Sequence, residues 1–366
     1  MRKACTVPGV LKDYRRFWPR KPWFWAALLS ASALSATPVG ATGCASNATL
    51  SACFDANSLW LPAGKASFIS MPDTHVTGVG QVSFGVASEW LHRPVVLHVN
   101  SPDTGGRDVH VVDSALDASF FLAFGVAKDL ELNLAAPLRL YQTGAGAGAL
   151  DSQSAPALER NAVLNPRMGL GYSLDDALAL NGFGLRVALD ASLPFANEQE
   201  FAGERSVVAM PSATAALSRG MLRMQASLGA RLRRSLDFGG VHLGNQGFLA
   251  LGVGLELLDP GQLFIGLEAF ALPPLSHSRA TLSDSVATAE TFMPAEWLAS
   301  VHSCFEKHGS WSLGVAAGTG IPLSSETRDN SGGPSTSHFL GVTTPGFRSL
   351  LVLRFAPPEL SRASTP

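Results

Sequence analysis

Charged side chains recur at alternating positions among leucines and alanines along much of this chain, and arginine is prominent among them. In the segment 130–141, leucines and alanines fill the even positions, while Glu131 and Arg139 occupy odd ones. A guanidinium binds carboxylates and other anions through paired hydrogen bonds. These residues are therefore candidates either to pair with one another or to attract an anion. The set comprises Arg139, Arg167, Arg186, Arg223, Arg231, Arg233, Arg348, Arg354, Glu131, Asp190, Glu256 and Glu268.

The elements that carry these charges have a period of two, which is the period of a β-strand whose two faces meet different surroundings. They are longer than the strands of soluble sandwich domains, which average about 5–6 residues, and a tilted strand needs about 9–11 residues to cross a membrane. A soluble sandwich also alternates, but small and charged residues suit a narrow lumen better than a packed core. We expect strands at 79–99, 109–127, 130–143, 164–174, 183–196, 206–218, 221–234, 246–258, 262–273, 294–306, 309–323 and 347–357.

The connections between these strands alternate between short and long. The short ones are 128–129, 175–182, 219–220, 259–261 and 306–309, and the long ones are 100–108, 144–163, 197–205, 235–245, 274–293 and 324–346. Short periplasmic turns and longer outer loops are typical of outer-membrane barrels. The sequence therefore predicts an all-β fold, a transmembrane antiparallel up-and-down β-barrel of about 12 strands with both ends in the periplasm. A change of parity at Pro94 predicts a bulge in the first strand.

Composition agrees with a membrane protein that crosses with strands. Hydrophobic residues make up 46% of the chain and charged residues only 15%, against about 25% in typical soluble domains. Seven basic residues, the apolar stretch 23–34 and small residues at 39–41 predict a signal peptide over residues 1–41, with a single membrane anchor as the alternative. Its removal leaves an acidic chain, which argues against nucleic-acid binding. Residues 42–78 are then a periplasmic N-terminal segment, 79–357 the barrel and 358–366 a C-terminal tail.

Two cysteines, Cys44 and Cys53, follow the expected cleavage site. An exported chain can oxidise such a pair to a disulfide that closes a small loop. The alternative is a lipid on Cys44, which would leave Cys53 without this partner. Cys304 is expected to be a small strand residue.

Sequence patterns of known catalytic sites are absent. There is no His-Glu-x-x-His and no phosphate-binding loop, and the histidines are scattered without metal-ligand spacing. His302 and Ser303 are adjacent, so on a strand their side chains point to opposite faces. We expect no enzyme activity, no cofactor and no metal, and an outer-membrane hydrolase is the less favoured alternative.

The stretch 59–357 resembles the N-terminal barrel of some OmpA-family proteins of Gram-negative bacteria. The resemblance rests on the opening Leu59-Trp60-Leu61-Pro62, on the strand 164–172 and on the general layout. Members of that family often continue into a peptidoglycan-binding domain, and we do not expect cell-wall anchoring from residues 1–366. The strand 347–355 is similar to the C-terminal signal that the barrel-assembly machinery reads, although residues 356–366 follow its final aromatic residue.

The resulting functional hypothesis is a narrow pore or transporter in the cell outer membrane. If the leucine faces meet outer-membrane lipid, the inner charges number eight arginines against four carboxylates, and rings of arginine favour anions. Eight strands leave a filled interior and sixteen an open channel, so twelve strands leave both outcomes open. We therefore expect passage of small solutes through a basic lumen, with a structural or surface-interaction barrel and a plugged lumen as the alternative.

Overall fold

The computed structural model describes most of the chain. These residues are 51–99, 107–146, 158–175, 182–197, 199–238, 241–257, 262–275, 293–305, 310–321, 327–328, 334–335 and 344–357. The predicted signal peptide, Cys44 and the C-terminal tail lie outside the described residues.

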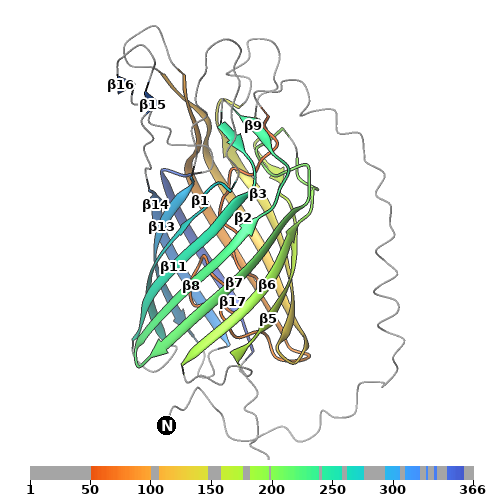
Figure 1. Ribbon diagram of the computed structural model, residues 1–366, viewed down its shortest axis with the longest axis vertical. Coiled ribbons are helices and arrows are strands. Elements are labelled where there is room, and N and C mark those ends of the chain that lie inside the picture. Colours follow the sequence, from red (N-terminus) through yellow and green to blue (C-terminus); the bar gives the residue numbers. More distant parts are fainter. Residues whose placement is uncertain are drawn as a thin grey trace, which may run out of the picture.

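Twelve strands form the wall of the molecule (Figure 1). They are β1 (Val82–Val99), β2 (Arg107–Ala127), β3 (Leu130–Thr143), β5 (Arg167–Ser173), β6 (Phe183–Ser192), β7 (Val208–Arg219), β8 (Leu222–Arg231), β11 (Gln246–Leu257), β12 (Leu263–Ala271), β13 (Ala295–Cys304), β14 (Trp311–Gly320) and β17 (Phe347–Phe355). The short strand β4 (Ala162–Val163) adds to β3. Two small hairpins lie in long connections: β9 (Leu236–Phe238) with β10 (Val241–Leu243), and β15 (Thr327–Arg328) with β16 (Pro334–Ser335).

Neighbouring wall strands are antiparallel, and the sheet closes on itself because β1 pairs with both β2 and β17. Closure satisfies the backbone groups that a sheet edge would leave unpaired, as a membrane-spanning sheet requires. The predicted fold class, a closed antiparallel barrel of twelve strands, is confirmed. Pro94 lies at a shift of register between β1 and β2, and Arg93 before it has a φ of 51°. The predicted bulge is therefore present.

The two ends of the barrel differ in the length of their connections, as the alternation of short and long gaps between strands in the sequence predicts. The short turns β2–β3, β5–β6, β7–β8, β11–β12 and β13–β14 lie at one end, together with the start of β1 and the end of β17. The turn between β7 and β8 contains Gly220 at a φ of 61°, a conformation that glycine adopts without steric cost. We call the two ends the short-turn end and the long-loop end.

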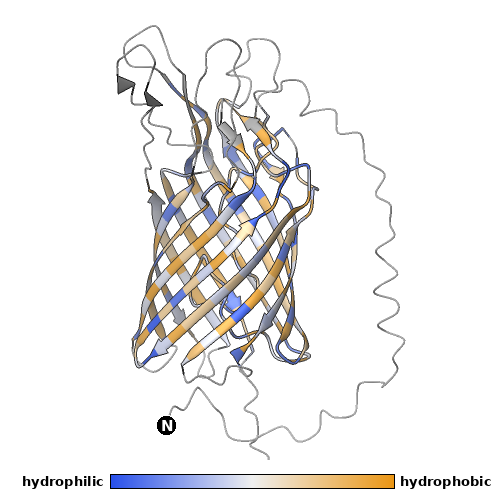
Figure 2. Cartoon of the chain, viewed as in Figure 1, coloured by the Kyte–Doolittle hydropathy of each residue, from blue (hydrophilic) through white to orange (hydrophobic). Residues whose placement is uncertain are grey.

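The outer face of the barrel is apolar. Leu189, Leu228 and Leu251 expose 54%, 62% and 67% of their surface, and hydrophobic residues alternate with polar ones along the strands (Figure 2). Exposed leucines in a continuous band are costly in water and suit contact with lipid chains. In the described part of the chain, no helix is long and apolar enough to cross a membrane.

Residues 51–78 lie inside the barrel, where they run as an irregular chain without regular strands (Figure 1). We call them the luminal segment. Asn57 bonds to β1 and β2, Ser58 to β13, and Ser70 to β12. A chain that bonds to the inner faces of β1, β2, β12 and β13 must lie within the closed wall. The sequence predicts a periplasmic N-terminal segment over residues 42–78, and the structure places residues 51–78 of it within the barrel wall.

The luminal segment runs from the long-loop end to the short-turn end. Phe54 packs against Phe201 and Phe238, which belong to long connections. At the other end, the Thr77 N–H donates to Glu131 at the start of β3. The segment then turns into β1 beside Gly125, whose backbone hydrogen-bonds with residues 80 and 81.

Candidate functional site: the filled lumen

The luminal segment is held in its upper part by Asn57. Its amide nitrogen donates to Glu89 at 2.8 Å and to Asp117 at 3.2 Å, and its amide oxygen accepts from Arg348 at 2.9 Å. Arg139 pairs with the same Asp117 through Nε at 2.7 Å and Nη2 at 3.1 Å. One neutral amide thus connects two buried arginines with their carboxylates. Such a buried network stabilises only when its members are all satisfied.

Arg348 extends this network to the next residue of the segment. It donates to both oxygens of Glu296, at 2.7 and 2.9 Å, and also pairs with Glu89. Glu296 in turn accepts from the Ser58 hydroxyl at 2.7 Å, and Arg231 donates to the Ser58 carbonyl at 2.6 Å. Charge-assisted and bidentate bonds of this kind are the strongest hydrogen bonds in proteins.

Glu268 on β12 binds the backbone in the middle of the segment. Its carboxylate accepts from the N–H of Ile69 at 2.8 Å, from the N–H of Ser70 at 2.7 Å and from the Ser70 hydroxyl at 2.6 Å. This irregular turn has no sheet partner for those groups. The carboxylate therefore takes the place of the missing backbone acceptors.

Two ion pairs anchor the segment near the short-turn end. Arg223 Nη2 donates to the two oxygens of Asp73 at 2.8 and 2.7 Å, and Arg223 also lies 3.6 Å from Glu256. Glu131, which accepts from Thr77, pairs with Arg186 at 2.6 Å. The segment is thus bound by charges at both ends and in the middle.

Apolar packing closes the long-loop end. Phe54, Phe201 and Phe238 are fully buried and contact one another edge to face, with ring centroids 5.1–5.5 Å apart. Beside them, burial raises the pKa of the Glu200 carboxyl above its usual value, although the Glu159 N–H donates to it at 2.7 Å. The mouth is therefore covered by long connections packed onto the start of the luminal segment.

Eleven of the twelve predicted charges lie on wall strands, and Arg233 follows the end of β8, where it contacts loop residues. Five of the arginines have carboxylate partners: Arg139 with Asp117, Arg186 with Glu131, Arg223 with Asp73, Arg233 with Glu204 and Arg348 with Glu296. Arg231 and Arg354 donate to backbone carbonyls of the luminal segment. Arg167 lies over the Trp60 ring. Of the four predicted acids, Asp190 lines a cavity, while the other three have the partners given above.

Six acidic residues of the lumen were not among the predicted ones. They are Glu89, Asp117 and Glu296 on the wall, Glu204 in a loop, and Asp55 and Asp73 on the luminal segment. Strand parity could have identified Glu89 and Glu296, because each precedes a tryptophan on the outer face. Among the described residues, these six acids and the four predicted ones accompany the eight arginines, so the predicted basic lumen is not confirmed.

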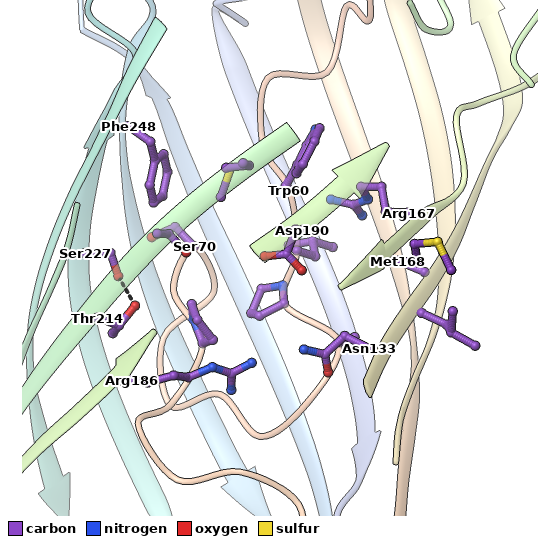
Figure 3. A pocket seen from close by; sticks show the side chains of 18 residues that line it. Trp60, Ser70, Asn133, Arg167, Met168, Arg186, Asp190, Thr214, Ser227 and Phe248 are labelled. Atoms are coloured by element: carbon purple, nitrogen blue, oxygen red, sulfur yellow. Dashed lines mark hydrogen bonds between the residues drawn. The ribbon is translucent and has the colours of Figure 1, made fainter. Parts of the chain in front are cut away.

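Space remains on one side of the luminal segment, around Trp60. A cavity of about 60 Å³ lies between residues 60–72 and strands β3, β5, β6, β7, β8 and β11 (Figure 3). Two smaller cavities of about 20 Å³ each are also lined by Trp60. Spaces of this size hold from one to a few water molecules. The guanidinium groups of Arg167 and Arg231 lie 5.3 and 4.7 Å from the Trp60 ring.

The cysteines are only partly described. Cys53 is disulfide-bonded, whereas Cys304 is a thiol. Because Cys44 lies outside the described residues, its pairing with Cys53 stays a prediction. Within the described ranges, no group of three or more His, Cys, Asp or Glu side chains is placed to hold a metal ion.

No family model and no curated protein matches this sequence. Among solved structures, the barrel is similar to the COG4313 outer membrane channel from Pseudomonas putida F1, with a TM-score of 0.52 and 13% identity over 79% of this chain and 99% of that one. The NanC porin aligns with a TM-score of 0.43 and 6% identity, covering 75% of this chain and 98% of that one. The chain thus shares the fold of an outer-membrane channel, whereas the resemblance to the OmpA family gains no support from these comparisons and stays a prediction.

Proposed function

We propose that the chain is a narrow channel for small polar solutes in the outer membrane, and that its luminal segment restricts passage. The observation that carries this proposal is the set of three cavities lined by Trp60, which follow one side of the segment inside the barrel. The apolar outer face and the channel-like fold support a position in lipid. In such barrels the short turns face the periplasm and the long loops face outward.

The chemistry of the cavities favours polar solutes over apolar ones. Arginine, aspartate, asparagine and serine side chains line them, and an apolar solute would displace water from these groups without replacing its hydrogen bonds. The cavities are small, so we expect a low conductance while the luminal segment is in place.

Planar-bilayer recordings of the purified full-length barrel test this proposal. We expect small, well-defined conductance steps for the wild type and larger ones for Trp60→Ala, because removing the indole joins the three cavities. Trp297→Ala is the matched control: its indole lies on the outer face and is 38% exposed, so conductance should not change.

A structural or surface-interaction barrel is the second candidate. The packed rings of Phe54, Phe201 and Phe238 favour it, because they close the lumen at the long-loop end. The buried ion pairs favour it as well, because they hold the luminal segment in place. If wild type and Trp60→Ala both insert into the bilayer and neither conducts, the channel proposal is wrong and this second function remains.

A further inference from the structure

Two charged side chains face the largest of the three cavities around Trp60. Arg167 on β5 and Asp190 on β6 both line it, and Figure 3 shows them next to Trp60. In the part of the chain that the structure describes, neither side chain has an ion-pair partner within 4 Å or a hydrogen-bond partner, and the Nε of Arg167 is buried. The third charged residue of the cavity, Arg186, pairs with Glu131 at 2.6 Å and also attracts the Asp190 carboxylate without forming a direct ion pair with it.

The backbone sets the separation of the two groups. Arg167 lies opposite Ser192 and Asp190 lies opposite Gly169, so the two charges are diagonal neighbours on adjacent strands. The backbones of diagonal positions are about 7–8 Å apart, and long side chains can reach across that distance. Gly169 leaves room for the Asp190 carboxylate, since a Cβ atom at that position would collide with its Oδ1.

Unpaired charges inside a barrel are costly unless water or a ligand solvates them. A single ion would be attracted by one of the two charged groups and repelled by the other. A solute with a cationic and an anionic end can satisfy both, with its anionic end at the guanidinium and its cationic end at the carboxylate. The volume of about 60 Å³ restricts such a solute to a few heavy atoms.

We propose that Arg167 and Asp190 form a binding site for small zwitterions of the amino-acid type, with the solute bound between the two charges. This inference rests on the proposed channel function and names the class of solute that the channel would select. The site lies beside Trp60, so an occupant would lie on the path along the luminal segment.

Glycine and glycolamide are suitable probes because they are isomers, and only glycine carries separated charges at neutral pH. We expect glycine to reduce the potassium chloride conductance of the full-length barrel in a saturable manner, and glycolamide to have little effect. Asp190→Asn and Arg167→Gln should each weaken the glycine block by about tenfold or more, as expected for loss of a hydrogen bond to a charged group. Leu189→Ala, which changes the outward-facing neighbour of Asp190 on β6, should leave the block unchanged, because that side chain is 54% exposed on the outer face.

The same two variants give a second readout that a purely structural role would not produce. In a salt gradient, Asp190→Asn should shift the reversal potential toward anion selectivity, and Arg167→Gln should shift it toward cation selectivity. Equal block by both isomers, or a glycine block that survives both substitutions, would overturn the site.

Failure of the channel and failure of the site can be told apart. If the wild type does not conduct, the proposed function is wrong, and equilibrium binding of radiolabelled glycine to the detergent-solubilised barrel tests the site alone. Binding that Asp190→Asn and Arg167→Gln both weaken would support the site, and absence of binding to the wild type would refute it.

Discussion

Asn57 and Arg348 lie 291 positions apart in the chain and are joined by a hydrogen bond of 2.9 Å inside the barrel. The bond links the luminal segment to the last strand of the wall. Through Glu89 and Asp117, the same asparagine also contacts the first two strands. The segment is therefore tied to the seam where the barrel closes, and its docking and the closure of the wall should depend on each other.

Replacement of Asn57 by leucine tests this dependence. The variant keeps a similar volume but removes one buried hydrogen bond from each of Glu89, Asp117 and Arg348, which keep their ion-pair partners. We expect a loss of about 2–3 kcal/mol in the free energy of unfolding. Urea unfolding in detergent micelles, followed by tryptophan fluorescence, measures the change. Ser67→Ala in the same segment is the control, because it removes a single bond of 3.3 Å and should cost less than about 1 kcal/mol. Equal losses in the two variants would contradict a central role for Asn57.

Glu268→Gln changes one oxygen of the carboxylate that binds the backbone of Ile69 and Ser70. The amide NH₂ would face N–H donors, so one or two of these bonds should break. We expect faster proteolysis of the segment near residues 67–71 and larger conductance steps, with the barrel still folded. Glu256→Gln is the control, since that side chain has 27% exposure and a single contact of 3.6 Å with Arg223. Unchanged proteolysis and conductance for Glu268→Gln would show that other contacts hold the turn.

The wall could be predicted from the sequence because each strand shows its own pattern. Leucines and charges alternate along 130–141 regardless of what lies elsewhere in the chain, and turn lengths follow directly from the gaps between strands. The bulge at Pro94 is also local, since it changes the parity of a single strand.

The luminal segment could not be predicted in the same way. Its backbone is held by side chains far away in the sequence, as Ile69 is by Glu268, 199 positions later. A strand alternates because its two faces meet different surroundings, whereas the luminal segment is surrounded by wall strands and has no such pair of faces. For the same reason, the acids that the segment brings into the lumen, Asp55 and Asp73, could not be assigned to it from strand parity.

Gly125→Ala should disturb the point where the luminal segment turns into β1. A Cβ atom at position 125 would collide with the backbone of Thr77 and Gly78, which cannot move without shifting the end of the segment. We expect a destabilisation of about 1–3 kcal/mol, typical of overpacking. At Gly346 a Cβ atom would meet only the His92 carbonyl, at 3.7 Å, so Gly346→Ala should be tolerated. Urea unfolding of both variants, compared with wild type, checks the difference.

The direction of the luminal segment predicts which of its ends faces the cell exterior. Residues 51–56 lie at the long-loop end, while His75 lies 3.5 Å from Asp175, beside the short turn between β5 and β6. With the long loops outside, Ser51→Cys should react with a membrane-impermeant maleimide on intact cells. His75→Cys should react only after the outer membrane is permeabilised. Both variants are made with Cys304→Ser, which removes the Cys304 thiol. Labelling of His75→Cys alone on intact cells would mean that the barrel has the opposite orientation, and that the segment begins at the periplasmic end.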